Sequence, residues 1–321
     1  MRYRPLSLAI FAAIALAAAP LSGQAENRAQ EPGAQLAHKA LGPADIIMPH
    51  ITDSKHLELP CWKGASEWAC EVTLPTWNVK LGNRVVDFGP TKHVVFLLLS
   101  ALLVALVVIL AARAHVQSTK TIGRPRGFAA GLEAVILYLR NDVFMPVLGG
   151  HGGERFIPFV LSLFFFILFC NLFGLIPYGS TPTGNISVTL TLALVTFVVV
   201  EIAGMRALGR GYLGTIIYWP HDMSLPLKLL LSPIMTPVEI IGKFTKPFAL
   251  TIRLFANMIA GHVIILALIG LIFMFGYAVA LAAIPMALFI MFLEILVAFI
   301  QAFVFALLAA VFIGQIRAAH H

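Results

Sequence analysis

The stretch Pro247-Phe-Ala-Leu-Thr-Ile-Arg-Leu-Phe-Ala-Asn-Met-Ile-Ala-Gly-His262 places one arginine, Arg253, inside an otherwise apolar run. The nearest acidic residue along the chain is Glu239. An arginine at the centre of a membrane helix costs about 2.5–3.5 kcal/mol on insertion scales, so it is retained where it has a partner or a water-lined cavity. Because no carboxylate lies within helical reach, we expect Arg253 to face a group on another chain. Pairing with Glu294 of the same chain is the alternative.

The composition around this stretch is that of a polytopic membrane protein. Apolar residues make up 60% of the 321 residues and charged residues only 12%, and the mean hydropathy is +0.91. The formal net charge of +7 comes from lysines and arginines that cluster beside apolar runs. We therefore interpret the positive charge as a determinant of membrane orientation, with no nucleic acid as partner.

Five apolar runs predict membrane-spanning helices in an all-α fold. They lie at about 94–112, 156–176, 188–205, 225–275 and 279–316, within a membrane domain at 91–321. The last two runs are too long for upright spans, so we expect them to tilt steeply and to form an antiparallel hairpin. Apolar residues at helical spacing from 128 to 139 predict a further short helix on the membrane surface.

The first 25 residues have the pattern of a secretory signal peptide. Arg2 and Arg4 precede an apolar run at 6–21, and small residues then lead to Ala25, where cleavage is expected. An uncleaved first membrane helix is the alternative, although about 16 apolar residues are few for a span. Cleavage would leave the mature N-terminus outside the cytoplasm.

The distribution of basic residues predicts the same orientation. Lysine and arginine recur between 113 and 155 and again at 206 and 210, whereas 177–187 contains neither. Because basic loops remain in the cytoplasm, these loops are expected to be cytoplasmic and the C-terminus with them.

The segment 26–90 is polar and rich in proline, glycine and histidine, and it predicts a loosely folded exported extension or a small cap. Cys61 and Cys70 are close enough in sequence to form a disulfide in an oxidising compartment. A zinc site that uses His50 or His56 is the weaker reading, because no second Cys-x-x-Cys accompanies them.

The polar residues of the 225–275 run share one helical face. At 100° per residue, three of them lie within about 40° of Arg253: Glu239, Lys246 and Asn257. Three alanines fall on the same face: Ala249, Ala256 and Ala260. Since small residues let helices approach closely in a membrane, this face is expected to contact another helix. Two other possibilities remain open: Glu239 and Lys246 can be a solvated pair near the end of the span, and Pro247 can kink the helix and rotate them away.

Three further polar residues predict a second site: His262, Glu294 and Gln301. His262 lies about 180° from Arg253 and roughly 13 Å further along the helix, so the two belong to different places on one path. Glu294 and Gln301, seven residues apart, share a helical face. A hairpin that brings all three together would form a polar cleft able to pass protons, although His262 and Gln301 can also serve as interhelical hydrogen-bonding residues.

Residues 245–262 closely resemble the signature of subunit a of F-type ATP synthases. Three other stretches also resemble this family: 171–177 (NLFGLIP), 185–189 (NISVT) and 300–305 (IQAFVF). The resemblance covers about 94–316 and gives little support for 32–90.

The resemblance implies the proton-translocating stator subunit of a rotary ATP synthase in a bacterial inner membrane. The implied partners are a ring of c subunits, the b subunits of the peripheral stalk and the rest of the complex. It further implies that Arg253 faces the ring carboxylate beside Asn257. His262, Glu294 and Gln301 would line an exported half-channel, and Glu239 and Lys246 a cytoplasmic one. Some bacterial members carry Glu at the position of His262 and His at that of Glu294, which implies that the two lie close together.

Other classes of membrane protein find less support in the sequence. It contains no G-x-x-x-x-G-K-[ST] nucleotide loop, so the chain is expected to be a non-catalytic subunit without cofactor or metal. A self-contained secondary ion transporter would show internal repeats, and a membrane-embedded hydrolase would show H-E-x-x-H or G-x-S-x-G; none of these is present.

Overall fold

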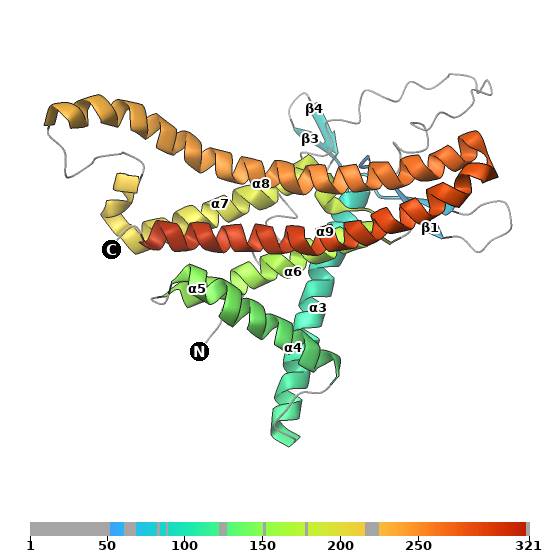
Figure 1. The fold of residues 1–321 in the computed structure, drawn as a ribbon, viewed down its shortest axis with the longest axis horizontal. Helices are drawn as coiled ribbons and strands as arrows, with labels where there is room; N and C mark the ends of the chain where they lie inside the picture. Colours follow the sequence, from blue (N-terminus) through green and yellow to red (C-terminus); the bar gives the residue numbers. More distant parts are fainter. Residues whose placement is uncertain are drawn as a thin grey trace. The chain divides into compact units, whose positions relative to one another are not determined.

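The computed structural model describes residues 52–60, 69–81, 84–87, 89–121, 127–149, 152–176, 179–215 and 225–318. Most of these residues are helical (Figure 1). The long helices are α3 (Lys92–Thr121), α6 (Ile157–Gly174), α7 (Ile186–Leu208), α8 (Leu225–Phe275) and α9 (Tyr277–Ala318). Shorter helices lie between them in the chain: α4 (Phe128–Tyr138), the π-helix η2 (Leu139–Phe144), α5 (Met145–Leu148), and the 3-10 helices η3 (Gly153–Phe156), η4 (Pro182–Gly184) and η5 (Gly209–Thr215). The signal peptide, His50 and Cys61 of the sequence predictions lie outside the described residues.

Within the described part of the chain, five stretches of helix are long and apolar enough to cross a membrane: Lys92–Leu110, Gly153–Gly174, Ile186–Leu208, Leu229–Phe275 and Tyr277–Arg317. The predicted all-α polytopic class and its five segments are confirmed. With 51 and 42 residues, α8 and α9 are about 77 and 63 Å long at 1.5 Å per residue, roughly twice the thickness of a bilayer core. Neither can span a membrane upright.

The chain packs as two compact units. The first unit combines residues up to 104 with 166–191 and 254–301. The second unit combines 105–165, 192–253 and 302–321. Each of the five long helices contributes residues to both units.

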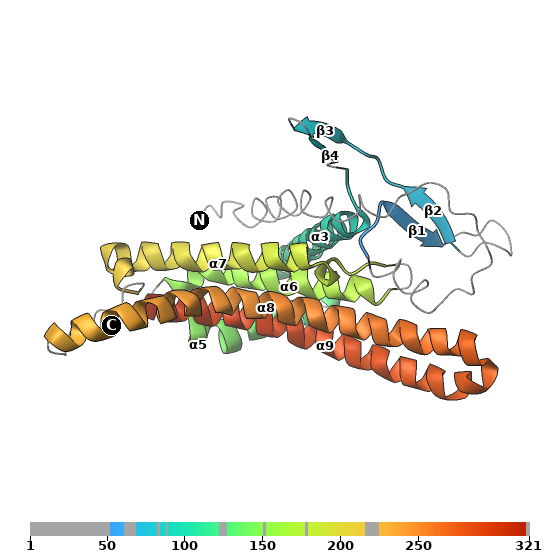
Figure 2. The ribbon, with the colours of Figure 1, turned by 90° about the horizontal axis from the view of Figure 1, so that it is seen from above.

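In the first unit, α8 and α9 form the predicted antiparallel hairpin, and residues 254–275 run beside 277–301 in both ribbon views (Figures 1 and 2). The chain reverses at Gly276, whose φ of 82° lies in the left-handed region that favours glycine. The Gly276 amide still donates to the Ile272 carbonyl at 2.9 Å, which closes the last turn of α8. The turn therefore reverses the chain with a single non-helical residue.

In the second unit, α9 packs through small side chains. Ala302, Ala306, Ala309 and Ala310 are fully buried. At Gly314 even a methyl group would overlap the Val147 carbonyl oxygen. These residues let neighbouring backbones approach closely, which is the usual packing of helices in a bilayer.

Pro247 does not interrupt α8, which continues as a helix through three internal prolines. The Pro247 carbonyl accepts a hydrogen bond from Thr251 Oγ1 at 2.9 Å. Glu239 and Lys246 both line one cavity of the second unit. Glu239 and Lys246, which both precede Pro247, therefore lie on a common side of the helix.

Two antiparallel strand pairs precede α3 (Figure 2). The first joins β1 (His56–Pro60) to β2 (Ala69–Thr73), and the second joins β3 (Asn78–Leu81) to β4 (Arg84–Asp87). The register pairs His56 with Thr73 and Asn78 with Asp87. The sequence analysis did not predict these strands, because runs of four or five residues in a polar segment are too short for a clear alternation of apolar side chains.

Candidate functional site

His262 and Glu294 form the central contact of the first unit. His262 Nδ1 lies 2.7 Å from Glu294 Oε1, and the two side chains are 24% and 4% exposed. The proximity predicted for this pair is confirmed. Among the described residues, the ion-pair partner of Glu294 is His262 of α8, and not Arg253, the alternative raised by the sequence.

The carboxylate of Glu294 lies against Gly261, where there is no side chain to displace it. A Cβ atom at Gly261 would lie 2.7 Å from Glu294 Oε1 and 2.8 Å from Cδ. Apart from the 2.7 Å contact with His262, neither Glu294 oxygen has a hydrogen-bond partner among the described residues. A buried carboxylate with a single polar partner is costly, so this group is expected to exchange protons or bind water.

We expect Gly261→Ala to reduce proton conduction by displacing the Glu294 carboxylate from His262. The added methyl cannot be accommodated without moving Glu294, because the contact lies below 3.0 Å. Gly242→Ala is the matched control, since a Cβ at Gly242 of the same helix meets nothing within 4 Å. Proton flux through membranes that carry each variant measures the effect. Equal flux in the two variants would contradict the proposed importance of the Glu294 position.

The other side of the His262 ring faces the loop after α6. Its Nε2 atom lies 2.9 Å from the Gly174 carbonyl oxygen and 3.1 Å from Thr181 Oγ1. Its Nδ1 atom also lies 3.0 Å from the Met258 carbonyl oxygen. A neutral imidazole donates a hydrogen bond from only one of its two nitrogens. Gain or loss of a proton at His262 therefore changes which of these hydrogen bonds the ring donates.

A second polar contact lies one to two turns away on the same two helices. Asn257 Nδ2 donates to Gln301 Oε1 at 2.8 Å. Gln301 is buried, and its Nε2 atom has no hydrogen-bond partner among the described residues. Gln301 therefore contacts Asn257 and not His262. The sequence predicted a single cleft formed by His262, Glu294 and Gln301, and the structure has two neighbouring contacts instead.

Asn171 links α6 to this part of the hairpin. Its Nδ2 atom donates to the Ala298 carbonyl at 3.5 Å, and its Oδ1 atom accepts from Thr183 Oγ1 at 2.7 Å. The sequence analysis noted Asn171 only as part of a family motif and did not consider Thr181 or Thr183. The polar residues at 171–189, between two apolar runs, were the feature of the sequence that could have identified these three residues.

The residues of the polar stripe on α8 are solvent-exposed in the isolated chain. All its members are exposed: Glu239, Lys246, Ala249, Arg253, Ala256, Asn257 and Ala260. The adjacent side of the helix is buried, with Leu250, Leu254 and Met258 at 3% exposure or less. Within the described residues, Arg253 has no ion pair or hydrogen bond.

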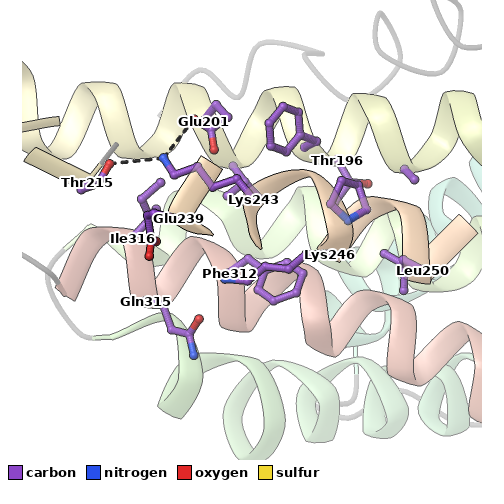
Figure 3. Close-up of a pocket in the computed structure, with 14 residues that line it drawn as sticks. Thr196, Glu201, Thr215, Glu239, Lys243, Lys246, Leu250, Phe312, Gln315 and Ile316 are labelled. Atoms are coloured by element: carbon purple, nitrogen blue, oxygen red, sulfur yellow. Dashed lines mark hydrogen bonds and ion pairs between the residues drawn. The ribbon is translucent and has the colours of Figure 1, made fainter. Parts of the chain in front are cut away.

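The second unit contains a cavity of about 220 Å³ beside α8 (Figure 3). Glu239 and Lys246 line it together with Lys243 and Glu201. Lys243 Nζ lies 3.7 Å from Glu201 Oε2 and 3.3 Å from both Tyr212 Oη and Thr215 Oγ1. These contacts hold a charged, hydroxyl-rich wall on one side of the cavity.

Lys246 reaches the opposite wall, where its Nζ atom lies 5.0 Å from the centre of the Phe312 ring. The sequence analysis missed Lys243, because it lies about 80° from Arg253 on a helical projection and so falls outside the stripe. Glu201 was missed because its partner is on another helix. Among the described residues, no group of three or more His, Cys, Asp or Glu side chains is placed to hold a metal ion.

The fold and these contacts define a class: a multi-pass α-helical membrane protein with ionisable and amide side chains buried between two long helices. The family model described as ATP synthase A chain matches residues 94–314. The chain belongs to this family.

Curated relatives agree with this assignment. An ATP synthase subunit a 2 of Chlorobaculum tepidum is 46% identical over 300 residues, which cover 92% of this chain and 78% of the relative. ATP synthase subunit a of an Anaeromyxobacter species is 42% identical and covers 90% and 74%. That of Myxococcus xanthus is 46% identical and covers 74% and 76%. Coverage of 92% means that the similarity extends into the segment before residue 94, for which the sequence analysis had found little support.

Proposed function

We propose that the chain is the stator subunit through which protons reach and leave a rotating ring of c subunits. The observation that carries the proposal is the outward, alanine-lined face of α8, on which the guanidinium of Arg253 is exposed without an ion pair among the described residues. A cation kept in a membrane helix needs a partner, and small residues beside it allow another helix to approach. A carboxylate on a moving helix satisfies both conditions.

Arg253 acts on that carboxylate through its fixed charge. A nearby cation favours the ionised form of a carboxyl group, so a protonated ring carboxyl that arrives beside Arg253 loses its proton. Arginine suits this role because it keeps its charge in a low-dielectric site, where a lysine can deprotonate. The same cation repels protons and prevents them from passing directly between the two sides.

The first unit is proposed to hold the exported half-channel. His262 and Glu294 form an ionisable pair in which His262 is the one polar partner of the carboxylate among the described residues, and Gln301 lies close to the ring-facing surface through Asn257. These groups can pass a proton from the exported side to the ring. Each charge that crosses about 100 mV releases roughly 2.3 kcal/mol.

The second unit is proposed to hold the cytoplasmic half-channel. The cavity lined by Glu239 and Lys246 provides room for water, and its wall carries the Lys243 and Glu201 charges. A proton released beside Arg253 would leave through this cavity.

The proposed setting is a bacterial inner membrane, with a cleaved signal peptide at 1–25, an exported extension at 26–90 and a membrane domain at 91–321. The N-terminus would be exported and the C-terminus cytoplasmic, consistent with the basic residues between 113 and 155. Its proposed partners are the c-ring, the b subunits and the rest of the ATP synthase.

Cysteine cross-linking tests which surface meets the ring. We expect Ala256→Cys and Ala260→Cys, both on the exposed stripe, to cross-link to a cysteine placed beside the mid-helix carboxylate of the c subunit. Leu102→Cys is the control, because Leu102 is 65% exposed but lies on α3. Cross-links of equal yield from Leu102→Cys, or none from the stripe, would contradict this placement.

A further inference from the structure

A cluster of three polar side chains lies where the segment before the membrane helices meets α3 and α7. Asp53 Oδ1 accepts a hydrogen bond from the His93 amide at 3.2 Å and lies 3.6 Å from His93 Nδ1. Asn185 Nδ2 lies 3.4 Å from both Asp53 Oδ2 and His93 Nδ1. Each member of the cluster therefore contacts the other two.

This cluster is buried to an unusual degree for charged groups. The side chain of His93 is 3% exposed and that of Asp53 is 13% exposed. The neighbouring Lys92 is also buried, and its amide donates to the Ser54 carbonyl at 2.9 Å. Burial of a carboxylic acid and an imidazole costs free energy, so their presence at this buried position indicates a function.

A small cavity continues from His93 toward the functional site. It has a volume of about 20 Å³ and is lined by His93, Ser180, Thr181 and His262. A space of this size accommodates about one water molecule. Ser180 Oγ is buried without a hydrogen-bond partner among the described residues, and Thr181 Oγ1 lies 3.1 Å from His262 Nε2. Polar groups thus line both ends of the space.

We propose that Asp53, His93 and Asn185 form the outer end of the exported half-channel, so that the segment before α3 supplies a proton-carrying carboxylate. A proton taken up by Asp53 passes to the His93 ring and then through the cavity water to His262 and Glu294. Each group gains one proton and loses one, and none is consumed. Asn185 orients the Asp53 carboxylate against the ring. The inference rests on the proposed function, since it names the outer residues of the same path.

The experiment uses the assembled complex in membrane vesicles stripped of the catalytic sector, where passive proton flux is measured. We expect Asp53→Asn to lower this flux about tenfold, because the amide keeps an acceptor for the His93 amide but cannot carry a proton. Asp53→Glu should retain most of the flux, and formate should partly restore it in Asp53→Ala. Asp142→Asn, at an exposed acidic residue of η2, is the control.

Wild-type flux in an assembled Asp53→Asn complex would overturn the inference and leave Asp53 as a structural anchor only. A loss of flux in Asp53→Ala that formate does not restore would also overturn it. If Asp53→Asn fails to assemble, Ser180→Val decides, because it fills the cavity without touching Asp53, and undiminished flux would refute the route. Arg253→Ala in membranes that keep the catalytic sector separates the two proposals: unimpaired ATP synthesis in that variant would refute the proposed function itself.

Discussion

Arg253→Ala is expected to lower proton-driven ATP synthesis by at least about a hundredfold while the complex still assembles, which is the magnitude lost when one preorganised charge is removed from a dry site. Assembly should survive because the Arg253 side chain is exposed, whereas the buried residues Leu250, Leu254 and Met258 of α8 are unchanged in the variant. Without the cation, the ionised form of the ring carboxyl is not favoured at this position, and the carboxyl is expected to keep its proton.

ATP synthesis driven by an imposed proton gradient measures this effect, and the amount of c subunit that copurifies with the chain reports assembly. Arg140→Ala is the matched control, because Arg140 is an exposed arginine of the π-helix η2. Arg253→Lys should fall between the wild type and Arg253→Ala, because lysine keeps a cation but can deprotonate. A fully coupled Arg253→Ala complex would refute the stator assignment.

The second large effect concerns His262 and Glu294. We expect the exchange His262→Glu with Glu294→His to retain more ATP synthesis than either His262→Ala or Glu294→Ala alone. The exchange keeps an imidazole and a carboxylate at the 2.7 Å contact, whereas each single alanine leaves its partner without a counter-group. Removing one member of a buried pair is far more damaging than the net worth of the pair, because the remaining charge stays buried.

A double-mutant cycle with the two alanine variants measures the coupling. Contacting residues couple by about 0.5–3 kcal/mol, so the double alanine variant should lose less than the product of the single losses. The pair Asn257 and Gln301, which is joined by its own hydrogen bond, provides a second cycle on the same hairpin. Independent losses at His262 and Glu294 would show that the contact does not carry a shared task.

The sequence predicted which polar residues of α8 share a helical face, and it did not predict their contacts with α7. The stripe around Arg253 was recognised because a helix repeats every 3.6 residues, so the face of a side chain follows from its number alone. Lys243 was missed because its ion-pair partner is Glu201 on α7, 42 residues earlier in the chain. Helical periodicity contains no information about which neighbouring helix faces a given side chain.

Asp53 and His93 illustrate the same limit more strongly. They lie 40 residues apart, and two strand pairs that the sequence analysis did not predict separate them. The contact between them depends on where the chain returns after β4, and that depends on backbone pairing rather than on side-chain pattern. The separation of Gln301 from His262 likewise depends on the register of α8 against α9, which Gly276 and the small residues of α9 determine.

The sequence by itself determined that the chain is a helical membrane protein with five spans, that Arg253 belongs to an exposed small-residue face, and that His262 is excluded from that face. These conclusions follow from run length, hydropathy and helical period, which are local properties. The family resemblance had already implied that His262 lies close to Glu294. Only the tertiary structure decided the other contacts between polar groups: Asn257 with Gln301, Lys243 with Glu201 and Asp53 with His93. Such contacts depend on how helices slide and rotate against each other, and close packing of side chains, which acts between distant segments, selects one register among many.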